Sequence, residues 1–252
     1  MTGKIKKILS AIFYPIVILA LALILWQILA TVAGSEFLFP SLPATFDATL
    51  KMLTLPSTYE ALGGTLFRTL LSFLISVTVA LALALLSALF PVLRKLLAPV
   101  VSACRALPTM AITLILSIWV GAKVAPVVVS LMVILPTAYA SFCEGINAID
   151  RDILDMAKID GAKKLTLAFY FLLPLSLTFS KRSTSANLSL NLKLMVASET
   201  LAGTARSIGH SMMVSSIYLE TATLMALTVL TVLVSVLLEW LLFLLLNLFF
   251  KD

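Results

Sequence analysis

The chain has 252 residues, of which 61% are hydrophobic and only 12% charged, and its mean hydropathy is +1.13. Soluble domains carry about 25% charged residues, so this composition excludes an ordinary soluble domain and indicates an integral membrane protein. The long Leu, Ala and Val runs do not alternate as the strands of a membrane barrel do, which predicts spanning helices. The net charge of +6 does not indicate nucleic-acid binding, because cations beside membrane spans are expected.

The chain begins with several lysines and a long apolar run, Ile8–Val32. The apolar core of a secretory signal has about 7–15 residues, so this longer run predicts a first spanning helix. The proline-containing stretch that follows, residues 34–64, predicts an external segment with short helices. We therefore divide the chain into an N-terminal part, residues 1–62, and a core domain, residues 63–252.

Further apolar runs predict the other spans, each long enough for a helix to cross a bilayer core of about 30 Å. The one near residue 190 is the weakest, because Ser, Thr, Asn and Lys interrupt it. The predicted fold class is therefore an all-α polytopic membrane protein with about six transmembrane helices. The later spans are expected at Leu66–Phe90, Leu97–Val120, Val124–Phe142, Leu175–Leu201 and Ala222–Phe250.

The cationic residues predict the orientation of these spans. With the N-terminus inside, Arg94, Lys95, Lys251 and the cations between residues 151 and 164 fall on the cytoplasmic side. The opposite side receives a sparser set, Lys51, Lys123 and Arg206. Cytoplasmic segments are enriched in Lys and Arg, so both termini are expected in the cytoplasm.

A charged segment, residues 147–174, separates the fourth and fifth spans. The spacing of its apolar residues predicts a short amphipathic helix, and Gly161 predicts a turn in the left-handed conformation. A second helix is expected to lead back to the membrane at Pro174. Such a protrusion is suited to dock into a groove on a cytosolic protein, or it merely connects two spans; the segment alone leaves both open.

Polar residues form a stripe along the fifth predicted span, and a second polar face carries Arg182 and Lys193. Polar groups inside a membrane normally face a bundle interior or a watery cavity. We hypothesise that this span lines a translocation pathway in which Lys193 attracts an anionic or polar solute; hydrogen bonding between helices is the alternative. The candidate pathway residues are Ser180, Thr184, Asn187, Asn191, Lys193, Ser198 and Glu199.

The chain contains no phosphate-binding GxxxxGK[ST] loop, no HExxH and no Ser/His/Asp set. An enzyme inside the membrane is therefore poorly supported, and no metal or directly bound cofactor is expected. If the protein moves a solute uphill, the energy has to come from a partner chain or from an ion gradient.

Four stretches together resemble the permeases of bacterial ABC importers, over about residues 60–250. Asp155-Met-Ala157, Gly161-Ala162 and Leu173-Pro174 have the spacing of the family's EAA loop, with Asp and Met at its first two positions. The other three stretches resemble the nitrate/sulfonate/taurine branch: Arg105–Gly121, Gly145–Asp152 and Val196–Glu199.

This resemblance implies a type I (MetI-like) permease fold in the bacterial inner membrane. It implies pairing with a second permease copy, a dimer of separate cytosolic ABC ATPases that use ATP, and an extracytoplasmic substrate-binding protein. The chain itself would not be an enzyme. The ATPase-coupling residues would be Ile153, Asp155, Met156, Ala157, Ile159, Asp160, Gly161, Ala162, Leu173 and Pro174.

Two other classes stay open at this point. One is the coupling transmembrane subunit of a vitamin-type (energy-coupling factor) importer, although Ala-Arg-Gly motifs of that class are not evident. The other is an ion-driven carrier or a membrane scaffold. The identity of the solute is not decided, but the resemblance favours small anions or small polar organic molecules.

Overall fold

The computed structural model describes residues 2–161 and 163–250, and these residues contain helices and turns but no strand. Ala162 and Lys251, which carry sequence predictions, lie outside the described residues. The all-α fold class is thus confirmed over the described part of the chain. The helices are α1 Thr2–Ala33, α2 Leu42–Leu53, α3 Pro56–Leu89, α4 Pro91–Ala106, α5 Thr109–Trp119, α6 Ala125–Asn147, α7 Arg151–Ile159, α8 Lys164–Thr166, the π-helix η1 Leu167–Leu172, α9 Leu173–Ala202, α10 Ile208–Ile217 and α11 Thr221–Phe249.

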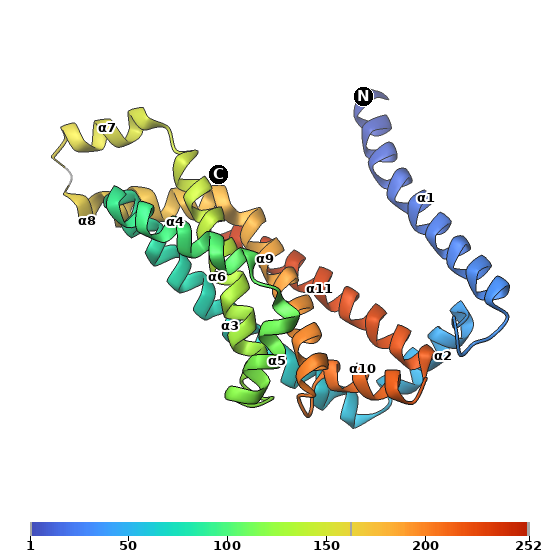
Figure 1. The fold of residues 1–252 in the computed structure, drawn as a ribbon. Coiled ribbons are helices and arrows are strands. Elements are labelled where there is room, and N and C mark those ends of the chain that lie inside the picture. The colour runs from blue at the N-terminus through green and yellow to red at the C-terminus, as the bar shows by residue number, and fades with distance from the viewer. Residues whose placement is uncertain (1, 162, 251–252) are drawn as a thin grey trace.

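The core of the molecule is a bundle of α3, α6, α9 and α11 (Figure 1). Helix α9 lies at its centre, because it contacts α3, α5, α6, α10 and α11. Helix α1 stands apart from this bundle and contacts mainly α2 (Figure 1). Its link to the following segment includes a hydrogen bond of 3.0 Å from Trp26 Nε1 to the Pro40 carbonyl oxygen.

The two ends of the bundle differ. Helix α7 protrudes at one end, on the same side as the start of α1 and the end of α11 (Figure 1). Helices α2 and α10 and the turn between α5 and α6 lie at the other end. The start of α1 and the end of α11 thus lie at the same end as α7; that both termini are cytoplasmic stays a prediction.

The third predicted span, Leu97–Val120, is wrong as a single helix. The chain breaks there into α4 and α5, whose axes are bent by 92°. The cause is Pro108: a proline disfavours the helical conformation for the residue before it, and Leu107 is extended, with φ −71° and ψ 131°. Hydropathy alone missed this break because both halves are apolar.

The composition of the described helices supports four spans, α1, α3, α6 and α11, or five if α4 and α5 together make one broken span. Helix α9 has 30 residues, about 45 Å at 1.5 Å per residue, so it is long enough to cross. It does not qualify as an apolar span because of its many polar residues. The predicted six spans therefore become four clear ones, a broken pair and the polar α9.

Helix α3 begins at Pro56, ten residues before the predicted span start at Leu66. Proline is favoured in the first helical turn, where its missing N–H removes no hydrogen bond. The predicted external segment is correspondingly shorter, and α2 is the short helix expected within it. The division of the chain into residues 1–62 and 63–252 stays a prediction; residues 62 and 63 both lie in α3.

A buried ion pair joins α3 to α9. The Glu199 carboxylate is fully buried, and its Oε1 lies 2.7 Å from both Nε and one terminal nitrogen of Arg68. Its Oε2 accepts a hydrogen bond of 2.8 Å from Thr65 Oγ1. That hydroxyl in turn accepts one from the Ile208 N–H, so the same cluster also holds the start of α10. We call Thr65, Arg68 and Glu199 the ion-pair cluster.

We expect Arg68→Met to lower the melting temperature of the purified protein in detergent, because it leaves the buried Glu199 carboxylate without its cation. Breaking a buried pair on one side costs about 3–5 kcal/mol in soluble proteins. The double variant Arg68→Met/Glu199→Gln removes both charges and should recover much of the loss. Arg105→Met serves as control, because that guanidinium makes a long bond of 3.3 Å to the Pro136 carbonyl. Equal melting of the single and double variants would contradict the stabilising role.

Close packing of α6 on α9 gives a second expectation. A side chain at Gly145 would collide with Ser180 Oγ and come within 3.0 Å of the Ser176 carbonyl oxygen. Gly145→Val should therefore destabilise the protein by about 1–3 kcal/mol through overpacking. Gly63→Ala is the matched control, because nothing lies within 4 Å of the added carbon. A thermal unfolding series that ranks the two variants in the opposite order would refute the packing argument.

Candidate functional site

The protruding helix α7 is defined at both ends by local chemistry. The Asp150 carboxylate accepts a hydrogen bond of 3.1 Å from the Asp152 N–H, as a residue before a helix start commonly does. The helix ends at Ile159, and the turn that follows contains Gly161, whose φ is +83°, a left-handed conformation that glycine adopts at low cost. The short helix and its glycine turn were both predicted, and both are confirmed.

The side chains of α7 divide into an inward and an outward set. Ala157 is buried and Leu154 half-buried toward the bundle. Met156 and Ile159 point outward and are 65% and 84% exposed, and Ile153 is also exposed. The predicted Asp155, Asp160 and Gly161 are exposed as well. Exposed apolar side chains on a charged, protruding helix indicate a surface that contacts another protein.

From α8 onward, the return to the membrane bundle is one unbroken helical path. The predicted second helix is present as α8 and η1, which continue directly into α9. Pro174 lies in the first turn of α9, and Leu173 and Pro174 are half-buried there. Since proline lacks an N–H and crowds the carbonyl four residues earlier, the wider π-helical turn of η1 just before it has a local cause.

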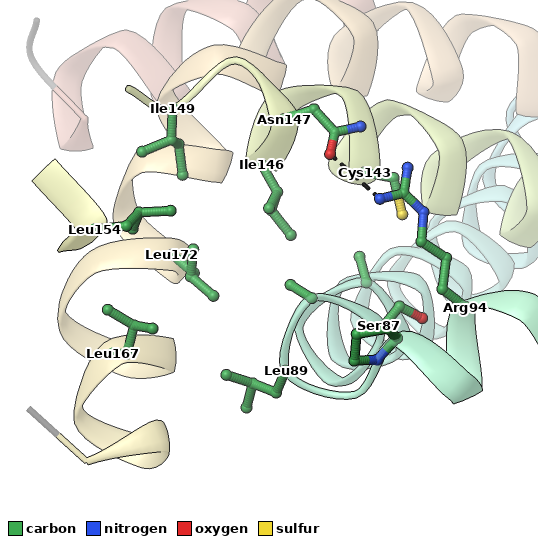
Figure 2. A pocket seen from close by; sticks show the side chains of 13 residues that line it. Ser87, Leu89, Arg94, Cys143, Ile146, Asn147, Ile149, Leu154, Leu167 and Leu172 are labelled. Atoms are coloured by element: carbon green, nitrogen blue, oxygen red, sulfur yellow. Dashed lines mark hydrogen bonds between the residues drawn. The ribbon is translucent and has the colours of Figure 1, made fainter. Parts of the chain in front are cut away.

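A cavity of about 410 Å³, which we call the inner cavity, separates α7 from the bundle. In Figure 2, Leu154 of α7 and Leu167 and Leu172 of η1 face it from one side, opposite Leu89 at the end of α3. Helix α7 itself packs mainly on η1. A protruding helix that rests on one neighbour beside an open cavity has room to shift relative to the bundle.

Two cations near the inner cavity, Arg94 and Lys164, make contacts between neighbouring helices. Arg94 donates a hydrogen bond of 3.4 Å to Asn147 Oδ1, which joins α4 to the end of α6 (Figure 2). The Lys164 ammonium lies 4.8 Å from the ring centre of Phe90, a cation–π contact between α8 and the corner of α3 and α4.

The predicted polar stripe on α9 faces the other helices of this chain. Asn191 Nδ2 donates to the Thr69 carbonyl at 2.8 Å and to Ser72 Oγ at 2.9 Å, both in α3. Ser180 donates to the Ser141 carbonyl of α6 at 3.1 Å. These bonds fit the alternative of hydrogen bonding between helices. The buried members of the stripe are Ser180, Thr184, Asn187, Asn191, Ser198 and Glu199.

Lys193 lies on a different face of α9 from the buried stripe. It is exposed, as are Arg182 and other residues at helical spacing. We call this the open face of α9; within the described chain no helix covers it. A role of any α9 residue in contacting solute stays a prediction. The open face comprises Phe179, Arg182, Ser183, Ala186, Leu190, Lys193 and Ala197.

Two residues of this region were missed by sequence reasoning. Arg68 is not among the candidate residues, yet it is the partner of Glu199. The two are far apart in sequence, and no pattern along the chain joins them. Lys181 is buried in α9 and was overlooked. Its spacing of three and four residues from Thr184 and Ser185, both buried, would have placed it on the inward face.

Solved structures with the same fold come from ABC transporters. One is a crystal structure of a bacterial alginate ABC transporter in complex with an alginate pentasaccharide-bound periplasmic protein, and it shares 14% identity with a TM-score of 0.60. The match covers 95% of this chain and 93% of that one. A second, of a bacterial ABC transporter that imports alginate, has 14% identity and a TM-score of 0.63, with 95% and 96% covered. These similarities establish the fold.

Sequence similarity establishes the family. The riboflavin transport system permease protein RibX of Chloroflexus aurantiacus is 34% identical over 194 residues, which are 74% of this chain and 70% of that protein. Residues 76–251 match the family model described as "Binding-protein-dependent transport system inner membrane component". With four apolar spans and the fold of ABC transporter permeases, the chain belongs to the family of binding-protein-dependent transport system inner membrane components, the multi-pass permeases of ABC transporters.

Proposed function

We propose that this chain is the permease subunit of an ATP-driven importer, in which a separate ATPase chain binds α7 and a binding protein delivers a small polar or anionic solute. The observation that carries the proposal is the outward apolar set on the protruding helix α7, namely Ile153, Met156 and Ile159. A turn joins α7 to α8 and η1, which continue into α9. The family assignment favours this function over an energy-coupling-factor subunit or an ion-driven carrier.

The coupling step follows from the shape of this protrusion. An amphipathic helix can lay its apolar residues into a groove on a partner, and Met156 and Ile159 are the most exposed ones on α7. Closure of two ATPase subunits would then move α7 over the inner cavity. Because α8, η1 and α9 are continuous, that movement would reach the polar centre of the bundle. The side bearing α7 would be the cytoplasmic side, as the cationic residues also indicate.

The open face of α9 supports a pathway that two permease copies enclose together. Arg182 and Lys193 are exposed on it, and charged side chains within a membrane bundle normally face a cavity or a partner. A second copy of this chain would cover part of the open face, and Arg182 and Lys193 would then point into a pathway between the two copies. Two cations there favour a solute with anionic or strongly polar groups.

Riboflavin is the first solute to test, because the relative with 34% identity is named for its transport. Uptake of labelled riboflavin by cells that express the complete transporter, compared with cells that lack this chain, checks this candidate directly. If cells that express the transporter take up another polar or anionic solute but no riboflavin, the importer function is supported and riboflavin is excluded as its solute.

For the coupling role, we expect Met156→Glu and Ile159→Glu to reduce co-purification of the ATPase subunit by roughly tenfold or more, since removing an apolar side chain from the centre of an interface commonly costs more than about 1.4 kcal/mol. Both side chains are exposed, so the fold should be unaffected. Leu38→Glu is a matched control, because Leu38 is 76% exposed but lies between α1 and α2 at the other end. Full retention of an active ATPase by both α7 variants would exclude the coupling role.

For the pathway role, we expect Lys193→Gln to raise the KM for uptake without changing the melting temperature, because Lys193 is exposed on the open face. Asn191→Leu should instead lower the melting temperature, since it removes two hydrogen bonds to α3. Measuring both quantities for each variant separates pathway contact from packing. Normal uptake by Lys193→Gln and by Arg182→Gln would leave the open face without a role in solute binding.

A further inference from the structure

A second cavity, of about 740 Å³, opens at the end of the bundle opposite α7. We call it the rim cavity. It lies between the first turns of α3, the start of α6 and the loop from α9 to α10. Neither the coupling role nor the pathway role uses it. Its charged lining residues are Arg68, Lys123, Arg206 and Glu60.

The charges of the rim cavity lie at one boundary of the apolar layer. From Thr69 to Leu89, α3 carries no charged residue, and at 1.5 Å per residue this stretch is about 30 Å long. That length equals the thickness of a bilayer hydrocarbon core, about 30 Å. Arg68 comes directly before this stretch, and Lys123 comes just before the charge-free stretch of α6. The cations therefore lie at headgroup level.

The apolar part of the lining continues from this level into the hydrocarbon layer. Leu71 and Val127 lie further along α3 and α6 than Arg68 and Lys123. Tyr59 and Phe67 flank the opening and are exposed, and aromatic side chains are enriched at membrane–water interfaces. The cavity thus has a cationic rim at headgroup level and an apolar groove at the level of the hydrocarbon chains. This lining is complementary to an amphiphile that has an anionic head and an apolar tail.

The rim has an excess of positive charge. The lining contains three cations and one carboxylate, Glu60, and Arg68 is additionally paired with the buried Glu199. Even with both carboxylates counted, positive charge exceeds negative charge. The Arg206 carbonyl accepts a hydrogen bond of 3.3 Å from Arg68, which holds the backbone of Arg206 in its positive-φ conformation of 53°. Its side chain is exposed at the opening.

Two glycines keep space free on the α3 side of the cavity. A side chain at Gly64 would collide with the Arg206 carbonyl oxygen, so close packing explains why a glycine stands at this position. At Gly63 nothing lies within 4 Å of an added carbon, and the residue lines the cavity. Glycine inside a helix is destabilising relative to alanine. The open space beside Gly63 is therefore not explained by packing within this chain.

We propose that the rim cavity binds one anionic phospholipid, with its phosphate among Arg68, Lys123 and Arg206 and an acyl chain along Phe67, Leu71 and Val127. Guanidinium groups match phosphate oxygens in charge and geometry. Because Arg68 also belongs to the ion-pair cluster, the bound phosphate would lie beside the contact between α3 and α9.

The test uses the purified full chain in neutral detergent, with phosphatidylglycerol, phosphatidylcholine or inorganic phosphate added. We expect phosphatidylglycerol to raise the melting temperature and to remain bound in native mass spectrometry, and the other two to do neither. Gly63→Leu should fill the cavity and weaken phosphatidylglycerol binding roughly tenfold, about 1.4 kcal/mol. Lys123→Ala/Arg206→Ala should do the same by removing charge. Lys51→Ala is the matched control, an exposed lysine of α2 outside the cavity.

Three results would overturn the proposal. Equal protection by phosphatidylcholine would show that the cavity does not select an anionic lipid. Equal protection by inorganic phosphate would show that it binds a free anion and not a lipid. Unchanged phosphatidylglycerol binding in Gly63→Leu and in the double variant would place the lipid elsewhere; lowered transport in the double variant would then assign its cations to the binding protein. The melting temperatures without lipid report whether each variant is folded.

Discussion

The fully buried carboxylate of Glu199 can exist in this bundle only because Arg68, Thr65 and the start of α10 surround it. An unpaired charge inside a membrane protein is strongly unfavourable, so α9 has to lie against α3 in this register. Asn191 adds two further bonds from α9 to α3. The faces of α9 that carry Glu199 and Asn191 are too polar to contact lipid, and α3 supplies the hydrogen-bond and charge partners of these side chains.

The position of α9 has a mechanical consequence, because the same helical path continues through η1 and α8 to the turn at Gly161. A displacement of α7 that reaches α8 through this turn would be passed along one continuous helical element to the centre of the bundle. The inner cavity allows such a displacement without first breaking a packed core. The wide turn of η1 lies where this path enters the bundle, and π-helical turns often mark functional positions. In the proposed importer, ATPase closure at one end and the polar centre are connected in this way.

The two cavities lie at opposite ends of α3 and differ in character. The inner cavity is lined by leucine and isoleucine side chains from α7, η1, α3 and α6, together with small and polar residues of α3, α4 and α6 (Figure 2). The rim cavity is ringed by cations, one of which holds Glu199. A partner at the first end would act on α9 through its continuous helix, and an anionic lipid at the second would act through the ion-pair cluster. The contact between α3 and α9 would receive both influences.

The local features of this protein can be read from its sequence: the apolar spans, the short helix followed by the Gly161 turn, and the shared face of Ser180, Thr184, Asn187 and Asn191. These follow from periodicity, from glycine conformation and from the low charge of the chain. Periodicity failed at Leu97–Val120, because an apolar run does not show that Pro108 turns its second half by 92°.

What each helix face contacts follows only from the packing of the helices. A helical pattern tells which residues lie together, but it does not tell whether a neighbouring helix, lipid or solute lies opposite. The pairing of Arg68 with Glu199, the inward position of Asn191 and the open position of Lys193 depend on how distant helices pack, and packing joins residues that no local pattern relates.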